Sequence, residues 1–463
     1  MAKKKSSKGS KGTKGEIGEE KSKPSAANNS STTLGSKLNA VVTAVLIAIL
    51  AIYAGFYFAG ENNDVSTGPR FVTPELEALV QWIEENGGFI DSRIAIRDGP
   101  LGRGVFLDGG DVNDDDGELY SIPETLYISW KTMQSKNSVM GPLLDDPQLD
   151  NFFEHETIMV AIALLAERNT PNSFWQPYIQ SLPQSHDDQA LFWSDAELND
   201  LQSPIVVKQI HTSRRWLNSH YDTLLSLVGR YPELFPDEST IMDDFLWAYY
   251  IVTSRCFDVA RPQDKDDEHS VGLNPFVDLL NHAFGKANHL HKIALRENDV
   301  SYWIGVPKKN LNVSKGDELV WSYKNFAEAS MNAFYRHGML DGDTDANTHG
   351  DYIVLKAGGK DWPVSAQGQV DSILFQTVPV AEIRAKVKGA IDELITTLEE
   401  DKAMLNDRNR TKEVRWVALV LRVRYKQILH KLLAWLEDGA EEGGLVIRQG
   451  ERTTAQSMFV LEI

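Results

Sequence analysis

The sequence predicts a protein of the α+β class, with short strands, a helical insertion, a helical C-terminal domain and one hydrophobic helix near the N-terminus. Two patterns predict the mixed class. Strand-like runs separated by turns occupy residues 88–129 and return between 271 and 323, whereas apolar residues recur at helical period in 130–250 and after 351. An uncharged apolar stretch at 38–59 predicts the hydrophobic helix.

The first 37 residues form a basic tail, with nine Lys, three Glu and almost no large apolar side chains. Such a segment cannot bury enough apolar surface to offset the entropy of ordering, so we expect disorder. We interpret it as a solubilising cytoplasmic tail, and binding to nucleic acid or acidic lipid is the alternative.

Residues 38–60 are predicted to form an uncleaved single-pass transmembrane anchor. The stretch 38–59 carries no charge, and about twenty residues rising about 1.5 Å each cross a hydrocarbon core of roughly 30 Å. A buried core helix disagrees with the polar segments on both sides, the tail and a linker at 61–73. A cleaved signal peptide disagrees with the long basic region and the missing small-residue cleavage site.

The rest of the 463-residue chain is acidic, with 38 basic against 63 acidic residues. This balance argues against non-specific nucleic-acid binding, which needs basic surface. It favours a basic partner segment, although an ordinary solvated surface gives the same count. Cys256 is the only cysteine, so the chain forms no internal disulfide and no cysteine-based zinc site, and we expect no metal.

An amphipathic helix is predicted over 74–86, with Thr73 as N-cap, Pro74 in its first turn and Gly87 as its stop. Short strands, an acidic turn (108–117), a charged loop (264–269), a hairpin into Trp321 and a polar linker (341–350) are also expected. The predicted strands are 94–96, 104–107, 119–122 and 300–306, and the further helices are 152–167, 205–228, 242–252, 380–398 and 411–436.

Polar residues interrupt two otherwise apolar stretches in the second half of the chain. The first, VGLNPFVDLLNH (271–282), places Asp278, Asn281 and His282 among apolar residues just after a proline. Buried polar groups need partners, so this stretch alone favours a buried turn that satisfies its own backbone. The second, GDELVWSY (316–323), reads as a turn and a short strand that ends on the hydroxyl of Tyr323.

Together the two stretches resemble the SET-domain protein methyltransferases, in the branch that includes the Rubisco large-subunit lysine methyltransferase and the actin-histidine methyltransferase. Further motifs of that branch follow in order between residues 74 and 340. They are Leu101–Val105, Ser135–Ser138 with Gly141–Leu143, Ser173–Tyr178 with Leu182–Pro183, Phe192–Ser194 with Leu198–Leu201, and Phe245–Ala248 with Ser254–Phe257.

The resemblance implies a pseudoknotted SET domain at 74–342 with a helical insertion at about 130–250, and a C-terminal domain at 351–463 that helps to bind a protein substrate. It implies S-adenosylmethionine as cofactor. The residues expected to hold this cofactor are Gly102, Arg103, Gly104, Ser135, Arg255, Asp278, Asn281, His282 and Tyr323.

The resemblance assigns different roles within that set. The glycine loop would let backbone approach the cofactor. Arg255 would pair with the cofactor carboxylate, and a surface ion pair is its alternative role. His282 is expected to act structurally rather than as a base. Tyr323 is the expected catalytic residue, because its hydroxyl would orient the attacking nitrogen and stabilise positive charge.

The expected function is therefore N-methylation of a protein lysine, with histidine as the alternative target, by a monomeric membrane-anchored enzyme. Lys324 stands where the family has glycine, and the segment 325–338 is about two residues longer than in the family. Both departures support a second hypothesis, a catalytically silent SET-like domain that binds a partner protein at the membrane. The charge rule places the Lys-rich tail in the cytoplasm and the catalytic domain across the membrane, whereas cofactor supply favours the cytosolic side, so orientation stays open.

Overall fold

The computed structural model describes residues 70–113, 115–185, 189–259, 271–283, 287–296, 299–323, 330–340, 351–407, 414–438 and 460–462. The chain divides into two units, Met1–Thr67 and Gly68–Ile463, and all of the described residues belong to the second. The predicted tail and anchor, the charged loop 264–269, Lys324 and the linker 341–350 lie outside the described residues. Within these ranges, no helix combines the length and apolar character needed to cross a membrane.

The first described helix, α2 (Pro74–Glu85), confirms the predicted amphipathic helix and buries Leu76, Leu79 and Ile83. Gly87 follows it with φ of +88°, a conformation that glycine adopts at little cost. The last residues of the predicted linker (61–73) contact residues 94–96, and residues 61–69 lie outside the described ranges. Phe71 already bridges to Ile96, and the Arg70 side chain donates to the carbonyl of Ile94 at 2.7 Å.

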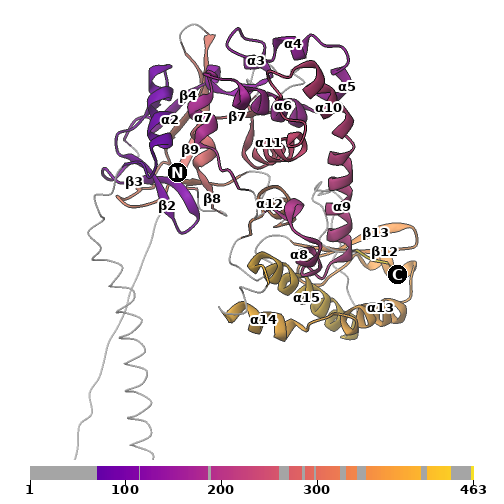
Figure 1. The fold of residues 1–463 in the computed structure, drawn as a ribbon. Helices are drawn as coiled ribbons and strands as arrows, with labels where there is room; N and C mark the ends of the chain where they lie inside the picture. Colours follow the sequence, from indigo (N-terminus) through magenta and orange to yellow (C-terminus); the bar gives the residue numbers. More distant parts are fainter. Residues whose placement is uncertain are drawn as a thin grey trace, which may run out of the picture. The chain divides into compact units, whose positions relative to one another are not determined.

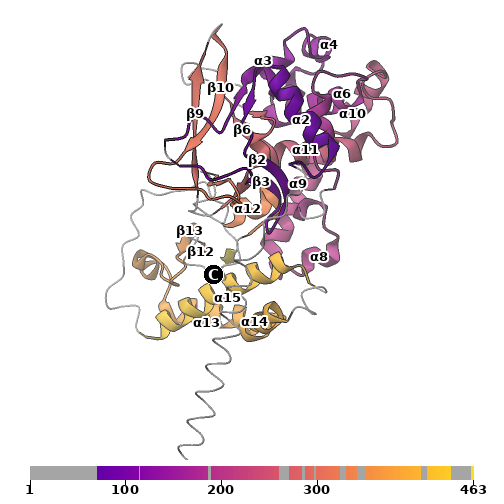
Figure 2. The same ribbon diagram turned by 90° about the vertical axis from the view of Figure 1, so that its left-hand side faces the viewer.

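The predicted strands 94–96, 104–107, 119–122 and 300–306 are present and lie in two small sheets, and a third sheet joins strands that were not predicted. In the largest, Figure 2 shows β9 and β10 as neighbours, and the order is β1-β4-β10-β9. The second sheet is a hairpin of β2 and β3, and the third has the order β5-β7-β6. Their bounds are β1 (Phe89–Ile90), β2 (Ile94–Gly99), β3 (Gly102–Leu107), β4 (Tyr120–Pro123), β5 (Ile128–Ser129), β6 (Cys256–Asp258), β7 (Val271–Leu273), β9 (His289–Leu295) and β10 (Ser301–Pro307).

The predicted hairpin into Trp321 is wrong, because β11 (Val320–Trp321) pairs in parallel with β8 (Asn281–His282). The residues just before β11 pair with β3 instead. The amide of Leu319 donates to the carbonyl of Val105 at 2.7 Å, and the amide of Leu107 donates to that of Asp317 at 3.0 Å. Residues 317–321 thus join the glycine-containing hairpin to the Asn-His element.

The predicted helical insertion is present, and its centre is α6, which packs on α11 with Ile158–Ala166 wholly buried (Figure 1). The single helix predicted over 205–228 is two helices, one ending at Asn218 and the next beginning at Tyr221. The helices are α3 (Trp130–Met133), α4 (Gly141–Leu144), α5 (Asp150–Phe153), α6 (Glu156–Asn169), α7 (Gln176–Ser181), α8 (Asp195–Asn199), α9 (Pro204–Asn218), α10 (Tyr221–Arg230) and α11 (Ile241–Arg255), with 3₁₀ turns η1 (Glu124–Leu126), η2 (Ala190–Phe192) and η3 (Val277–Leu279).

The C-terminal domain contains a three-stranded sheet in addition to the predicted helices. Its order is β13-β12-β14, and β14 pairs in parallel with β12 from more than a hundred residues away. Local periodicity cannot show such a distant pairing. The elements from residue 330 onward are α12 (Ser330–His337), β12 (Ile353–Ala357), β13 (Lys360–Val364), η7 (Ser372–Gln376), α13 (Val380–Asp392), α14 (Leu398–Asn406), α15 (Trp416–Glu437) and β14 (Val460–Glu462).

Buried ion pairs anchor α15 to its surroundings. The Lys426 ammonium contacts the Asp401 carboxylate at 2.6 Å with both side chains fully buried, and it also donates to the Gln202 amide oxygen at 3.1 Å. Because Gln202 precedes α9, this network ties the C-terminal helices to the helical insertion. A buried charge that loses its partner is costly.

Asp401→Ala should therefore lower the free energy of unfolding of residues 68–463 by about 3–5 kcal/mol. The matched control is Asp392→Ala, which removes a pair with Lys388 whose two side chains are 60% and 63% exposed, and which should cost at most about 1 kcal/mol. Denaturant unfolding followed by circular dichroism measures both. Equal effects of the two substitutions would contradict the role given to the buried pair.

Candidate active site

The parallel β8–β11 pair brings the two polar stretches into contact. The amide of Tyr323 donates to Nδ1 of His282 at 3.0 Å, and the Tyr323 hydroxyl donates to the carbonyl of Leu280 at 2.9 Å. The two rings lie with centroids 4.9 Å apart. Residues forty positions apart in the chain therefore form one cluster, as the sequence predicts.

Burial raises the pKa of Tyr323 to about 12, although the positive charge of Arg255 acts in the opposite direction. The hydroxyl is therefore protonated at neutral pH. It can orient a ligand through its oxygen lone pairs and its proton, but it is not a phenolate base.

The turn before the Asn-His element is strained. Phe276 follows Pro275 with φ of +72°, a region that a bulky side chain rarely occupies. Its ring is fully buried and packs on Tyr120, with ring centroids 5.0 Å apart. Strain of this kind persists only where the surroundings determine it, and it concentrates at functional sites.

The glycine loop lies against Asn281, another of the residues predicted to hold the cofactor. The Asn281 side-chain amide donates to the carbonyl of Arg103 at 3.2 Å and to the Glu318 carboxylate at 2.6 Å. A Cβ at Gly104 would overlap that carboxylate and would lie 2.7 Å from Nδ2 of Asn281. Gly104 is thus required by close packing, whereas Gly102 is favoured by its φ of +89°.

Glu318 is a residue to which the sequence analysis assigned no role. It lies inside the GDEL turn that marked the second stretch, and it joins that turn to Asn281. Burial raises its pKa, and the hydrogen bond from Asn281 partly offsets the effect. The signal in the sequence from which a role for Glu318 could have been inferred is its position as a charged residue next to apolar strand residues.

Asp278 and Arg255 form a partly buried ion pair within the same cluster. The Arg255 guanidinium donates to the carbonyl of Asp278 at 2.8 Å and approaches its carboxylate at 3.4 Å. The Tyr178 hydroxyl donates to that carboxylate at 3.0 Å. Tyr178 belongs to the SFWQPY motif and, like Glu318, had no predicted role at the site. Arg255 therefore does not form the alternative surface ion pair.

Arg103 adds a second positive charge. Its guanidinium donates to the carbonyl of Ser181 at 2.9 Å, which fastens the glycine loop to the end of α7. Burial lowers the pKa of Arg103, and the nearby charge of Arg255 lowers it further, whereas Asp278 opposes both. Asp98, which lies opposite Arg103 in the β2–β3 hairpin, also opposes the lowering, and the two guanidinium groups are suited to contact an anionic ligand group.

Ser135 is the one predicted residue that no contact joins to this cluster. It is exposed, and its hydroxyl accepts only a local hydrogen bond, from the amide of Asn137 at 3.3 Å. Its neighbour Ser138 instead donates to the buried Glu167 at 2.9 Å, and Ser173 of the SFWQPY motif donates to the same carboxylate at 2.6 Å. These motif residues hold the scaffold together.

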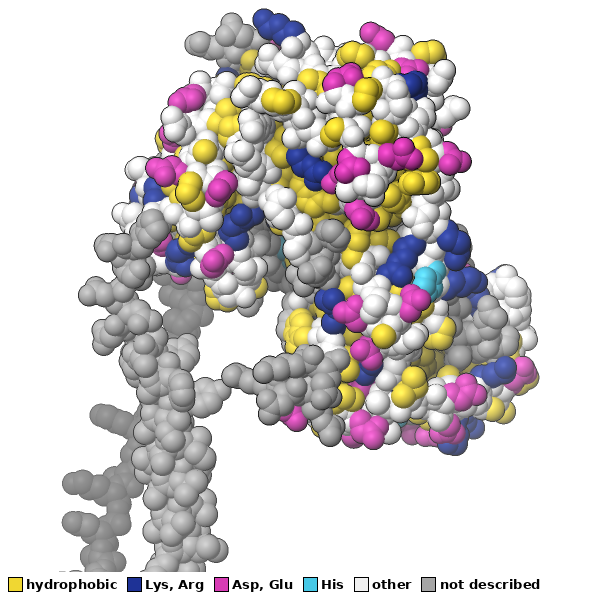
Figure 3. Space-filling model, viewed as in Figure 1, with side chains coloured by type: hydrophobic (Ala, Val, Ile, Leu, Met, Phe, Trp, Pro, Cys, Tyr) yellow, Lys and Arg dark blue, Asp and Glu magenta, His cyan; other side chains and the backbone are white. Residues whose placement is uncertain are grey.

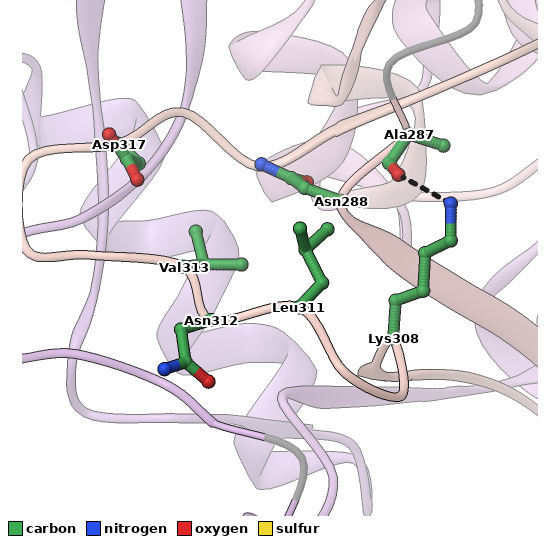
Figure 4. A pocket seen from close by; sticks show the side chains of 7 residues that line it. All are labelled: Ala287, Asn288, Lys308, Leu311, Asn312, Val313 and Asp317. Atoms are coloured by element: carbon green, nitrogen blue, oxygen red, sulfur yellow. Dashed lines mark hydrogen bonds between the residues drawn. The ribbon is translucent and has the colours of Figure 1, made fainter. Parts of the chain in front are cut away.

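A pocket of about 400 Å³ lies near this region but contains none of the predicted site residues (Figure 4). In it the Lys308 ammonium donates to the carbonyl of Ala287 at 3.3 Å, so that its charge is turned toward backbone. The pocket is lined by Ala287, Asn288, Lys308, Leu311, Asn312, Val313 and Asp317.

Comparison with known proteins supports the predicted resemblance, although no protein-family model matches the chain. Actin-histidine N-methyltransferases of Canis lupus familiaris and Homo sapiens are each 28% identical over 210 residues, which is 45% of this chain and 34% of theirs. The chain thus spans about a third of the length of these curated relatives.

Solved structures show the fold. The SET domain of LSMT bound to lysine and AdoHcy superposes with a TM-score of 0.61 at 18% identity, covering 80% of this chain and 92% of that one. Rubisco LSMT bound to AdoMet gives 0.58 at 18% identity, over 79% and 92%. The described chain therefore has the α+β SET fold that the sequence predicts.

Gly104→Ala should destabilise residues 68–463 by about 1–3 kcal/mol, because the new methyl group displaces Glu318 from Asn281. Gly117→Ala is the control, since a Cβ there meets no atom within 4 Å and should change stability by less than about 0.5 kcal/mol. Thermal unfolding of the two variants and the parent measures the difference. A Gly104→Ala protein as stable as the control would show that the loop tolerates a side chain.

Proposed function

We propose that this chain is an S-adenosylmethionine-dependent protein N-methyltransferase that acts on lysine, with histidine as the alternative acceptor. The observation that carries the proposal is the cluster in which Tyr323 contacts His282 while Asn281 contacts the glycine loop. It occurs in a fold whose solved members are bound to AdoMet, AdoHcy and lysine. The relatives in sequence are named as histidine methyltransferases.

The residues of the cluster fit such a cofactor. The guanidinium groups of Arg103 and Arg255 suit the cofactor carboxylate. The backbone at Gly102, where a Cβ would meet no atom within 4 Å, offers an approach without a side chain, and the backbone of Asn281 and His282 would hold the adenine side. Ser135 remains a predicted contact without support from its position.

When bound, S-adenosylmethionine supplies a methyl group on a positively charged sulfur. The Tyr323 hydroxyl, protonated and buried, would hold the acceptor nitrogen in line and place its oxygen lone pairs near the developing charge. Because the acceptor must be neutral, an entering lysine must lose a proton. Burial and the nearby guanidinium of Arg255 both favour the neutral amine.

His282 supports this arrangement as a structural residue. Its Nδ1 accepts the backbone hydrogen bond of Tyr323, so that this nitrogen positions the tyrosine. This agrees with the expected structural role and leaves Tyr323 as the residue to test.

A catalytically silent, membrane-tethered binding module is the second candidate. Lys324 replaces the expected glycine directly after the tyrosine, and the Tyr323 hydroxyl donates to the Leu280 carbonyl. Retained cofactor affinity without turnover would favour this candidate. On the face shown in Figure 3, acidic and basic side chains are intermixed.

Tyr323→Phe should leave folding and cofactor affinity unchanged and reduce turnover at least tenfold, about 1.4 kcal/mol in the barrier. The control is Tyr302→Phe on β10, whose ring lies beside Arg296 and not in the cluster. Single-turnover methyl transfer and calorimetric cofactor binding provide the two readouts. Full turnover by the Tyr323 variant would assign the role to another residue.

Arg255→Ala should weaken cofactor affinity at least tenfold and affect maximal rate less, because the guanidinium would bind the cofactor carboxylate. Arg296→Ala is the control, since Arg296 pairs with Glu118 instead. Titration calorimetry compares the variants, with thermal unfolding to confirm that each is folded. Unchanged affinity after loss of Arg255 would restrict its role to holding Asp278.

We further propose that residues 38–60 tether the domain to a membrane. The positive-inside rule and the need for cytosolic cofactor predict opposite orientations. Asn312 decides between them, because it is exposed on the turn after β10 and begins an Asn-Val-Ser glycosylation sequon. The second sequon, at Asn409, lies outside the described residues.

The orientation test expresses the full chain in eukaryotic cells. A lumenal domain should shift in mobility after glycosidase treatment, lose that shift in Asn312→Gln unless Asn409 is also modified, and resist protease in sealed microsomes. A cytosolic domain should show no shift and be digested. The second result would overturn the charge rule for this chain.

A further inference from the structure

A Tyr-His-His cluster lies outside the candidate active site, on the face of the β1-β4-β10-β9 sheet. Tyr120 comes from β4, and His289 and His291 are alternate residues of β9, so that both imidazoles point to one face of the sheet. The Tyr120 hydroxyl lies 2.9 Å from Nε2 of His289 and 2.5 Å from Nε2 of His291. The two nitrogens are 3.0 Å apart.

A glycine makes this convergence possible across an intervening strand. In the sheet register Tyr120 lies opposite Gly305 of β10, and Gly305 lies opposite His291. A Cβ at Gly305 would overlap the Tyr120 ring. Because glycine has no such atom, the phenol lies over the middle strand and reaches the two histidines beyond it.

The three side chains have the chemistry of metal ligands. Tyr120 is fully buried and His289 is 2% exposed. Neutral imidazole binds a divalent metal ion through a ring nitrogen, and a phenol binds one as phenolate, although burial raises the pKa of the Tyr120 hydroxyl well above its ordinary value. Nδ1 of His289 lies 3.2 Å from the Asn288 amide oxygen, a common outer contact of metal-binding histidine.

A buried donor without an acceptor lies next to the cluster. The indole rings of Trp321 and Trp303 have centroids 4.3 and 5.5 Å from that of His291. Among the described residues, the indole N–H of Trp303 and Nδ1 of His291 have no hydrogen-bond partner, whereas the Trp321 side chain hydrogen-bonds toward Tyr323. An unpaired donor of this kind suits an anionic fourth ligand such as hydroxide.

We propose that Tyr120, His289 and His291 bind one divalent transition-metal ion, of the zinc or copper class, through two imidazole nitrogens and a phenolate oxygen. Tetrahedral coordination with bonds of about 2.0–2.1 Å separates ligand atoms by about 3.3 Å. The ligand atoms must therefore move apart by a few tenths of an ångström, and by somewhat more between the Tyr120 hydroxyl and His291. Nitrogen and oxygen donors suit these ions. Coordination of the phenolate releases the Tyr120 proton to solvent.

The ion would act on the architecture of the site, because Trp321 connects the cluster to the catalytic candidate. The Trp321 ring packs on His291 on one side and lies 5.2 Å from the Tyr323 ring, measured between centroids. The metal ion would thus cross-link β4 and β9 next to the segment that leads from β11 to Tyr323. This inference does not rest on the proposed methyl transfer. It departs from the expectation of no metal, which was drawn from the lack of cysteine ligands.

The test uses the full chain in detergent, stripped with a chelator and titrated with Co(II) and then Zn(II). The expected result is one Co(II) per chain with visible absorption bands of a nitrogen and oxygen site, which Zn(II) abolishes. His291→Gln and Tyr120→Phe should each weaken binding at least tenfold. His211→Gln on α9, which removes a partly exposed histidine, is the control and should bind as the parent does.

Circular dichroism first establishes that each variant is folded. A folded parent chain that takes up less than about a tenth of an equivalent of either metal would overturn the proposal and leave a hydrogen-bonded triad. Binding that survives in both folded ligand variants would also overturn it, since the ion would then lie elsewhere. Because the parent chain alone can give a negative result, the test does not depend on the variants.

Discussion

The parallel pairing of β8 with β11 is the interaction on which the candidate site depends. It sets Asn281 beside Val320 and His282 beside Trp321, and so places Tyr323 directly after the paired segment. The residues just before β11 pair with the glycine hairpin, which delivers Glu318 to Asn281. One short strand thus contacts both the Asn-His element and the glycine loop. Few backbone hydrogen bonds hold it, so the side-chain contacts around it carry much of its stability.

Two guanidinium groups and two carboxylates set the charge of the cluster. The carboxylate of Asp278 is buried, and Tyr178 and Arg255 both contact it, while the backbone of Ser181 holds the second guanidinium, Arg103, near which Asp98 adds a further negative charge. Burying charges is costly unless they are paired. A ligand that brings a carboxylate would give these guanidinium groups a further partner.

The sequence predicted the parts of the site that depend on residue type and local order. Asn281, His282, Tyr323 and the glycine loop meet as expected. Glu318 and Tyr178 had no predicted role, because their partners Asn281 and Asp278 lie 37 and 100 residues away and only the folded chain shows those pairs. Two features elsewhere in the chain were also not predicted, because local sequence patterns do not show them. The β12–β14 pairing is non-local, and the apolar period continues across the break between α9 and α10, so that periodicity alone does not show this break.

The most direct test of the account is methyl transfer itself. Residues 68–463 and the Tyr323→Phe variant are incubated with cell lysate and S-adenosylmethionine carrying an isotopically labelled methyl group, and the proteins are analysed by mass spectrometry. The account predicts labelled lysine, or labelled histidine, on one or a few proteins in the parent reaction and at least tenfold less in the variant reaction. A folded parent protein that binds the cofactor and labels no protein side chain would contradict it.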